Sequence, residues 1–261
     1  MIATARDGSK LHFTVTGTGP TIVLLGGKTS TIEAAWWRYI PVLGQQLRVI
    51  ALDNRGAGDS DKPDLPYTTT LMAEDALAVL AAAGEDSAHW FGISLGGMIA
   101  QQIALSRPDA ARSLILTATH CGDNPGGAGG AQAEALRGNA LARYSNLYST
   151  NFILENPAWV TEDARHFGKM PLHAIHRQDQ SVRNHHTCER LKEIRQPVLI
   201  IHGRQDRMVS VHRAEEMAAA LPNAELKILD PAGHQVHSEQ FHPVIQLVLD
   251  FVRRVESSRQ D

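Results

Sequence analysis

Short apolar runs alternate along the chain with longer segments in which apolar residues recur at helical spacing. The apolar runs predict strands at residues 10–16, 21–25, 48–52, 87–93, 113–118, 196–202 and 224–229. The segments with helical spacing predict helices at residues 32–46, 70–83, 98–104, 211–221 and 243–255. Strands that alternate with helices are typical of a mostly parallel sheet with helices on both faces. The pattern therefore predicts an α/β fold.

Glycine and proline punctuate this pattern near the N-terminus. The stretch Gly17-Thr18-Gly19-Pro20 lies between the first two predicted strands and predicts a hairpin turn. Pro41 lies inside the helix predicted for residues 32–46 and predicts a kink or break there, because proline has no N–H to donate.

The alternation stops between residues 120 and 195, where no convincing strand is found. A glycine-rich stretch at residues 122–130 leads into segments with helical spacing at 131–148, 161–169 and 172–194. We therefore predict a core formed by residues 1–119 and 196–261. Residues 120–195 are expected to form a helical cap inserted between two strands of its sheet.

Composition places the chain among soluble globular proteins. Its 261 residues are 43% hydrophobic and 20% charged, and its formal net charge of -3 gives no reason to expect nucleic acid or an anionic membrane as a partner. No apolar stretch is long enough to span a membrane, and the N-terminus lacks the pattern of a secretory signal. Two cysteines, Cys121 and Cys188, do not make a disulfide framework, so a reducing cytoplasm is expected. The oligomeric state is open, and a homodimer is compatible with the sequence.

The first candidate for chemistry is the stretch Gly92-Ile93-Ser94-Leu95-Gly96-Gly97. It follows a predicted strand and opens a predicted helix, which is the context of a nucleophile elbow. The sharp turn exposes the serine above the sheet, and the helix N-terminus beneath it stabilises developing negative charge. Ser94 is therefore the predicted nucleophile, against the simpler interpretation that it only caps the helix.

A serine nucleophile needs a histidine base and a carboxylate that orients the base. Catalytic groups of α/β sheets gather at the carboxyl ends of the strands. Asp206 and His234 follow the last two predicted strands, and the order Ser94, Asp206, His234 is the order this architecture uses. Asp123 and His237 are the alternative acid and base.

The motifs together resemble those of the α/β-hydrolase superfamily, and the resemblance covers residues 8–255. They are Gly92-x-Ser94-x-Gly96-Gly97, Asp53-x-Arg55-Gly56-x-Gly58-x-Ser60, Gly203-x-x-Asp206-x-x-Val209, and Ala232-Gly233-His234 with Glu239 behind it. Within the superfamily, the chain is similar to 3-oxoadipate enol-lactonases and to bacterial esterases of the aclacinomycin methylesterase type. The resemblance implies an α/β-hydrolase fold with a helical cap and a serine esterase or lactonase that needs no cofactor.

The same resemblance implies an oxyanion hole. The family commonly has His-Gly after an early strand, where this chain has Gly26-Gly27-Lys28, a departure shared with the methylesterase type. The backbone N–H groups of Lys28 and Leu95 are the predicted donors, since backbone donors need no particular side chain. The substrate pocket is expected to include Gly27, Trp37, His120 and Tyr144.

The remaining conspicuous residues are expected to have structural roles. Asp53 and Arg55 are predicted to hold their turn together by an ion pair. His89 and His202 are predicted to be satisfied histidines within strands. His173 and His176 have helical spacing, but no known metal-binding pattern accompanies them, so we expect no metal.

The function predicted from these residues is hydrolysis of a small or medium carboxylic ester or lactone. One alternative is a non-hydrolytic enzyme on the same scaffold, such as a lyase, a C–C bond hydrolase or a cofactor-free oxygenase or perhydrolase. A second is a small-molecule receptor that retains the triad without rapid turnover. Activity that survives Ser94→Ala favours the first, and tight binding with negligible hydrolysis favours the second.

Overall fold

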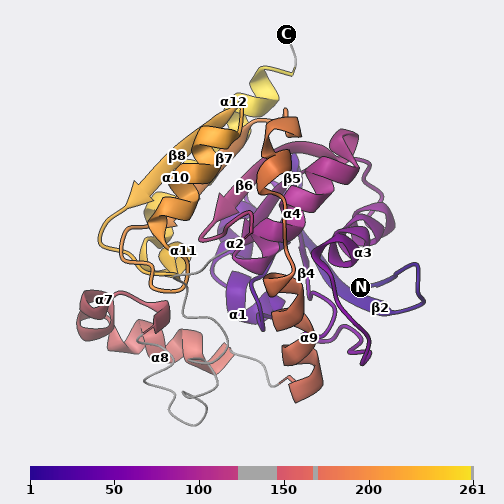
Figure 1. Cartoon of the computed structure of the whole chain (residues 1–261), viewed down its shortest axis with the longest axis horizontal. Helices are drawn as coiled ribbons and strands as arrows, with labels where there is room; N and C mark the ends of the chain where they lie inside the picture. The colour runs from indigo at the N-terminus through magenta and orange to yellow at the C-terminus, as the bar shows by residue number, and fades with distance from the viewer. Residues whose placement is uncertain (123–145, 167–169, 260–261) are drawn as a thin grey trace.

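The computed structural model describes residues 1–122, 146–166 and 170–259, and Figure 1 shows its arrangement. Within these residues, eight strands form one sheet in the order β1-β2-β4-β3-β5-β6-β7-β8. The strands are β1 (Ile2–Thr4), β2 (Lys10–Thr16), β3 (Thr21–Leu25), β4 (Arg48–Leu52), β5 (Ala88–Ile93), β6 (Ala111–Thr117), β7 (Val198–Gly203) and β8 (Ala224–Leu229). The pairs β1–β2 and β2–β4 are antiparallel, and all other pairs are parallel. The predicted mostly parallel sheet is confirmed.

The predicted hairpin between β2 and β3 is wrong. Although both strands have the expected bounds, β2 pairs with β4, while β3 lies between β4 and β5. All residues of β3 are buried, which suits a central strand covered on both faces. The connection passes close to the segment before β4, where a Cβ on Gly17 would lie 2.3 Å from the carbonyl oxygen of Gly44. The glycines thus permit a close crossing instead of a tight turn.

Two hydrophobic clusters cover the two faces of the sheet. Along β3, Val23 and Leu25 belong to the first cluster, whereas Ile22 and Leu24 belong to the second, as the alternation of side chains in a strand requires. Helices α3 (Thr69–Ala82), α4 (Leu95–Ser106) and α10 (Val211–Ala220) contribute to the first cluster. Helices α1 (Ile32–Trp36), α2 (Tyr39–Leu43) and α12 (Phe241–Ser257) contribute to the second. The short elements η1 (Pro108–Ala110) and α11 (Val236–Glu239) precede β6 and α12.

The predicted break in the first helical segment is confirmed, but it falls before Pro41. Helix α1 ends at Trp36 and α2 begins at Tyr39, so that Pro41 lies in the first turn of α2. The N–H groups of a first turn have no partner within the helix, and proline costs little there.

The chain between β6 and β7 is helical where the structure describes it. It contains α7 (Thr150–Glu155), α8 (Pro157–His166), α9 (Leu172–Arg183) and the 3₁₀ helix η2 (Cys188–Glu193), and no strand lies in these described parts. In Figure 1, α7 and α8 lie beyond one end of the sheet. Residues 123–145 are outside the described residues, and they include the alternative acid Asp123, the predicted pocket residue Tyr144 and nearly all of the glycine-rich stretch. The cap limits stay a prediction. Among described residues, no helix has both the length and the hydropathy needed to cross a membrane.

The predicted ion pair between Asp53 and Arg55 is wrong, because each residue has a different partner. The fully buried guanidinium of Arg55 donates to Asp75 at 2.7 Å and to Asp7 at 3.0 Å. Asp53 accepts from the backbone N–H of Ile32 at 2.7 Å and contacts Nδ1 of His12 at 2.8 Å. Both residues still have the structural role expected of them.

The two cysteines form a disulfide, which corrects the expectation drawn from their number. Cys121 follows β6 and Cys188 begins η2, with a sequence separation of 67 residues. Because these positions come just after β6 and shortly before β7, the bond closes a loop that contains α7, α8 and α9. The cytoplasmic location stays a prediction, without support from the cysteines.

Removing this disulfide is expected to lower the free energy of unfolding by about 4 kcal/mol, because the unfolded chain regains the entropy of a long open loop. Urea unfolding of the oxidised protein and of the double variant Cys121→Ala, Cys188→Ala measures the difference. A reductant should shift the unfolding midpoint of the natural protein and leave that of the variant unchanged. Equal midpoints for the oxidised protein and the variant would contradict the expectation.

Candidate active site

Ser94 stands at a sharp turn between β5 and α4. Its backbone has φ 52° and ψ -114°, a strained conformation that few residues with a side chain adopt. A Cβ on Gly92 would lie 2.3 Å from the backbone of Gly96, and a Cβ on Gly96 would lie 2.0 Å from the carbonyl oxygen of Leu25. Only glycine fits at these two positions. The serine itself is held by a hydrogen bond of 2.7 Å from Oγ1 of Thr119 to its carbonyl oxygen.

Asp206 and His234 are brought together by the loops that follow β7 and β8. Nδ1 of His234 lies 2.8 Å from Oδ2 of Asp206, and the side chain of Asp206 is completely buried. A Cβ on Gly203 would lie 2.2 Å from the carbonyl oxygen of Gly233, so the two loops approach closely. The backbone N–H of Gln205 also donates to a carbonyl of the second loop at 2.8 Å.

The surroundings of Asp206 favour its ionised form. Burial alone would raise the pKa of this carboxyl, but the charge of His234 and hydrogen bonds from His202 and His234 hold the pKa well below its usual range. The backbone N–H groups of Met208 and Val209 donate to Oδ1 at 2.8 and 2.9 Å. An ionised carboxylate only accepts hydrogen bonds, so the proton of a neutral His234 lies on Nδ1. Its Nε2 is then free to act as a base.

The three candidate residues lie at one edge of the sheet. Ser94 follows β5, Asp206 follows β7 and His234 follows β8, and these strands are parallel. The hydroxyl of Ser94 forms no hydrogen bond to His234 in the described structure. Such bonds often tighten only when substrate is bound.

The loop after β3 lies next to the serine. A Cβ on Gly27 would lie 3.5 Å from Cβ of Ser94. Among the described residues, none accepts a hydrogen bond from the backbone N–H of Lys28 or Leu95, which leaves both groups available as donors. The Lys28 side chain points elsewhere, because its Nζ pairs with Asp179 at 2.6 Å. This geometry suits a backbone role for Lys28.

Comparisons with known proteins agree with this arrangement. The family model described as alpha/beta hydrolase fold matches residues 20–241. The chain belongs to this family.

Several proteins similar to this chain are named as hydrolases or lactone-cleaving enzymes. The chain is 28% identical over 254 residues to the "Putative carbamate hydrolase RutD" of Stutzerimonas stutzeri, covering 92% of this chain and 94% of that protein. It is 27% identical over 267 residues to 3-oxoadipate enol-lactonase 1 of Acinetobacter baylyi, covering 98% of each. The solved structure of Est816, an N-acyl homoserine lactone degrading enzyme, has a TM-score of 0.84 and 26% identity over 96% of this chain and 100% of that one. These relatives support a hydrolase.

His202 is closer to the candidate site of this α/β hydrolase than its place in an apolar strand suggests. Its Nε2 lies 3.2 Å from Oδ2 of Asp206 and 3.0 Å from the carbonyl oxygen of Val209. Both partners are acceptors, so Nε2 carries a proton, while the buried Nδ1 has no hydrogen-bond partner. The prediction of a satisfied histidine is therefore wrong for His202. It is confirmed for His89, whose ring nitrogens contact Ser113 and Glu256.

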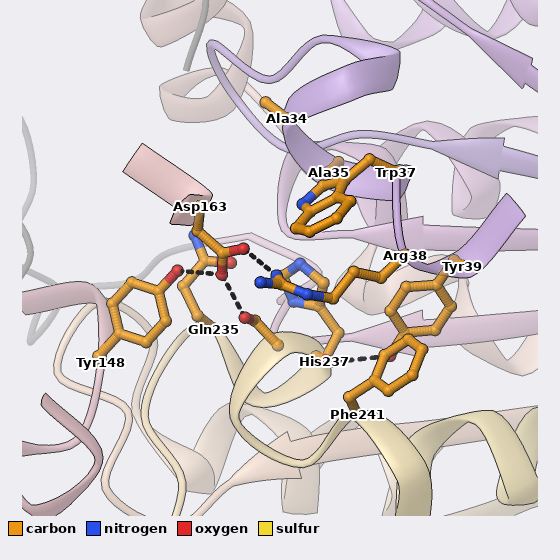
Figure 2. A pocket seen from close by; sticks show the side chains of 11 residues that line it. Ala34, Ala35, Trp37, Arg38, Tyr39, Tyr148, Asp163, Gln235, His237 and Phe241 are labelled. Carbon is orange, nitrogen blue, oxygen red and sulfur yellow. Dashed lines mark hydrogen bonds and ion pairs between the residues drawn. The ribbon is translucent and has the colours of Figure 1, made fainter. Parts of the chain in front are cut away.

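The pocket residues predicted from sequence lie in different places. His120 is buried beside the site, where burial and the charge of His234 lower its pKa to about 4, and its Nδ1 has no hydrogen-bond partner. Trp37 lines a hollow between core and cap, shown in Figure 2. In that hollow, Arg38 pairs with Asp163 of α8, and its guanidinium lies 3.9 Å from the centre of the Trp37 ring. Trp36 is buried in the core.

The alternative base His237 lines the hollow of Figure 2. The histidine in contact with Asp206 is His234. The ring of His237 lies tilted against two aromatic side chains, with 6.2 Å between ring centres to each of Trp36 and Tyr39. Burial lowers the pKa of His237 to about 4. His234 therefore remains the better candidate for the base.

Of the two α9 histidines with helical spacing, His173 contacts the core of the fold. Nε2 of His173 lies 2.9 Å from the carbonyl oxygen of Lys62. The group with metal-ligand spacing in the described residues is instead His12, Asp53 and Asp59, with ligand atoms within 4.8 Å of one another. Asp53 already accepts hydrogen bonds from two backbone N–H groups there, so the group has a sufficient structural role.

Proposed function

We propose that this chain is a cofactor-free serine hydrolase that cleaves a small or medium carboxylic ester or lactone through an acyl-enzyme. The hydrogen bond between Asp206 and His234, at the same sheet edge as the strained Ser94, carries the proposal. This arrangement suits nucleophilic catalysis because a serine hydroxyl is a weak nucleophile until a base removes its proton.

In the proposed mechanism, Oγ of Ser94 attacks the substrate carbonyl carbon while Nε2 of His234 takes the hydroxyl proton. The carbonyl oxygen becomes an oxyanion, which the N–H groups of Lys28 and Leu95 stabilise. The bond to the leaving oxygen then breaks, and His234 gives that oxygen its proton. Water attacks the acyl-enzyme in the same way, with His234 as base, and Ser94 recovers its proton. Asp206 stabilises the charged His234 at each step.

The relatives support an acyl substrate with an oxygen leaving group. One of them is named as an enol-lactonase and another is described as an N-acyl homoserine lactone degrading enzyme. In a lactone, the leaving hydroxyl stays attached to the acyl chain after ring opening. The carbamate named for the RutD relative also has an attackable carbonyl. We favour esters and lactones, and a carbamate belongs in the same substrate panel.

Incubation with a small alkyl fluorophosphonate tests the proposed nucleophile. Attack by Ser94 on phosphorus displaces fluoride, so intact-protein mass should increase by one adduct. We expect no adduct on Ser94→Ala and an unchanged adduct on Ser106→Ala, a matched change at the far end of α4. An unlabelled wild-type protein, or an adduct that persists on Ser94→Ala, would contradict the proposal. Labelling would be followed by an ester, lactone and carbamate panel.

A further inference from the structure

Helix α9 of the predicted cap contacts the loop that contains the proposed oxyanion donor Lys28. Gln178 of this helix is fully buried. Its Oε1 accepts a hydrogen bond of 2.8 Å from the backbone N–H of Thr29, and its Nε2 donates to the carbonyl oxygen of Arg55 at 2.9 Å. The neighbouring Asp179 pairs with Nζ of Lys28 at 2.6 Å. Two successive residues of the loop are thus held by two successive residues of α9.

The loop itself has a conformation that needs support. The N–H of Ser30 donates to the carbonyl oxygen of Gly27 at 3.1 Å, which closes a four-residue turn with Thr29 in the third position. Thr29 has φ 64°. A positive φ at this position is typical of a type II turn, which normally has glycine or asparagine there. For a β-branched residue such as threonine, it is a genuine outlier.

The helix that supports this turn is itself fixed to the core. His173 contacts the carbonyl oxygen of Lys62 at 2.9 Å, and Arg177 pairs with Asp64 at 3.0 Å. Ala174 is fully buried, and its Cβ would lie 3.3 Å from a Cβ placed on Gly56. α9 is therefore docked on the segment that follows β4. From this position it presents Gln178 to the turn after β3.

The partners of Gln178 also determine the orientation of its amide. Thr29 offers an N–H and Arg55 offers a carbonyl oxygen, so only one of the two amide orientations satisfies both. A side chain that is buried and has both polar groups paired is costly to replace by an apolar one, because the N–H of Thr29 then loses its acceptor.

We propose that Gln178 is a positioning residue for the oxyanion hole. It holds Thr29 in the left-handed conformation and thereby keeps the N–H of the preceding Lys28 directed toward the oxyanion. Without Gln178, Thr29 relaxes to a negative φ, the turn changes type and Lys28 moves with it. This inference rests on the proposed serine hydrolase function.

The rate of Ser94 labelling by the alkyl fluorophosphonate tests the inference without knowledge of the substrate, because the phosphoryl oxygen occupies the oxyanion hole. Gln178→Met keeps the side-chain length and removes both hydrogen bonds. We expect its labelling rate constant to fall about 10- to 100-fold, somewhat less than the loss of a whole oxyanion donor. Gln180→Met, an exposed change on the same helix, should stay within about twofold of the wild type.

A second substitution separates positioning from general destabilisation. Glycine adopts a positive φ without support, so Thr29→Gly added to Gln178→Met should restore most of the lost labelling rate. Because glycine also relieves the strain at Thr29, urea unfolding of both variants is measured alongside, and labelling rates are compared only under conditions in which each variant is fully folded. An undiminished rate in Gln178→Met, or a diminished rate that Thr29→Gly does not restore, would overturn the inference.

If Gln178→Met does not fold, Gln178→Glu takes its place, because the neutral acid expected at this buried position retains an oxygen for the N–H of Thr29 and an O–H for the carbonyl oxygen of Arg55. Labelling within about threefold of wild type is then expected, and a tenfold loss in the folded Glu variant would count against the role of Gln178. A wild-type protein that is not labelled at all removes the proposed function, and this inference falls with it. Equal labelling of wild type and Gln178→Met removes the inference alone.

Discussion

Asp206→Asn is expected to lower kcat/KM for hydrolysis about 10⁴-fold, which corresponds to about 5.5 kcal/mol of transition-state stabilisation. The backbone N–H groups of Met208 and Val209 determine how the new amide lies, because they require an oxygen at the position of Oδ1. The amide NH₂ must then face Nδ1 of His234. A donor at that position stabilises the tautomer with its proton on Nε2, which cannot accept the proton of Ser94.

His202 adds to this effect. Its Nε2 carries a proton directed at the same oxygen of Asp206, so an NH₂ group there would meet a second donor. Labelling rates with the fluorophosphonate and hydrolysis rates for the best ester should decrease together. Asp230→Asn, at an exposed site in the loop after β8, is the matched control and should retain wild-type rates. Rates for Asp206→Asn within threefold of wild type would exclude Asp206 as the acid of the triad.

Most elements of the sheet could be predicted because they depend on local patterns, although the short strand β1 was missed. β2, β3, β4 and β8 have the bounds expected from their apolar runs. The pairing of those strands could not be predicted in the same way, because the choice between a β2–β3 hairpin and a β2–β4 pair depends on residues far apart in sequence. In the structure β3 lies between β4 and β5, and all of its residues are buried. The break near Pro41 shows the same limit on a smaller scale, since the proline is accommodated in a first turn.

The sequence also could not predict which distant residues form ion pairs and disulfide bonds. Arg55 was expected to pair with Asp53 two residues away, but it reaches Asp75 and Asp7, which approach only in the folded chain. The cysteines are likewise 67 residues apart, and they meet where the segment after β6 lies beside the start of η2, with the N–H of Thr187 donating to the carbonyl oxygen of Cys121 at 2.7 Å. Their small number gave no indication of a bond.

In the candidate site, too, residues with a local sequence signal could be predicted and residues with only distant partners could not. Ser94 was identifiable because its neighbouring glycines are required by contacts within the elbow, and Asp206 and His234 because both follow strands of a parallel sheet. Gln178 had no such signal. It lies in a helix whose docking is determined by side chains such as Arg177 and His173, and its partner Thr29 precedes it by 149 residues. No spacing rule connects such positions.

Lowering the pH from 7.5 to 5 is expected to destabilise the fold strongly, because several buried histidines resist protonation. Burial lowers the pKa of His89, His120 and His237 to about 4 each, and that of His185 to about 3. In the unfolded chain the same groups have pKa values of about 6.5. The unfolded state therefore binds protons first as the pH falls. Stability is present in full above about pH 6.5 and is lost progressively toward pH 4.

At pH 5 each of these histidines costs about 2 kcal/mol of stability, so the four together cost about 8 kcal/mol. That loss is comparable with the total stability of a typical domain, about 5–15 kcal/mol. Asp206 cannot account for a loss in this range. Its pKa is lowered, so its contribution is present above about pH 4 and disappears only as the pH falls through its lower folded value.

Urea unfolding at pH 7.5, 6 and 5 measures the effect, and the free energy of unfolding should fall most steeply between pH 6 and 5. His185→Gln removes one of the four groups and should reduce that fall by about 2 kcal/mol, even though it loses contacts with Thr69 and Thr187. His212→Gln, at a side chain that is 78% exposed, should leave the pH dependence unchanged. A free energy of unfolding that is the same at pH 7.5 and 5 would mean that these histidines accept protons within the fold. Their surroundings would then have to open to water or rearrange around the charge, and the packing beside His234 would be the first place to examine.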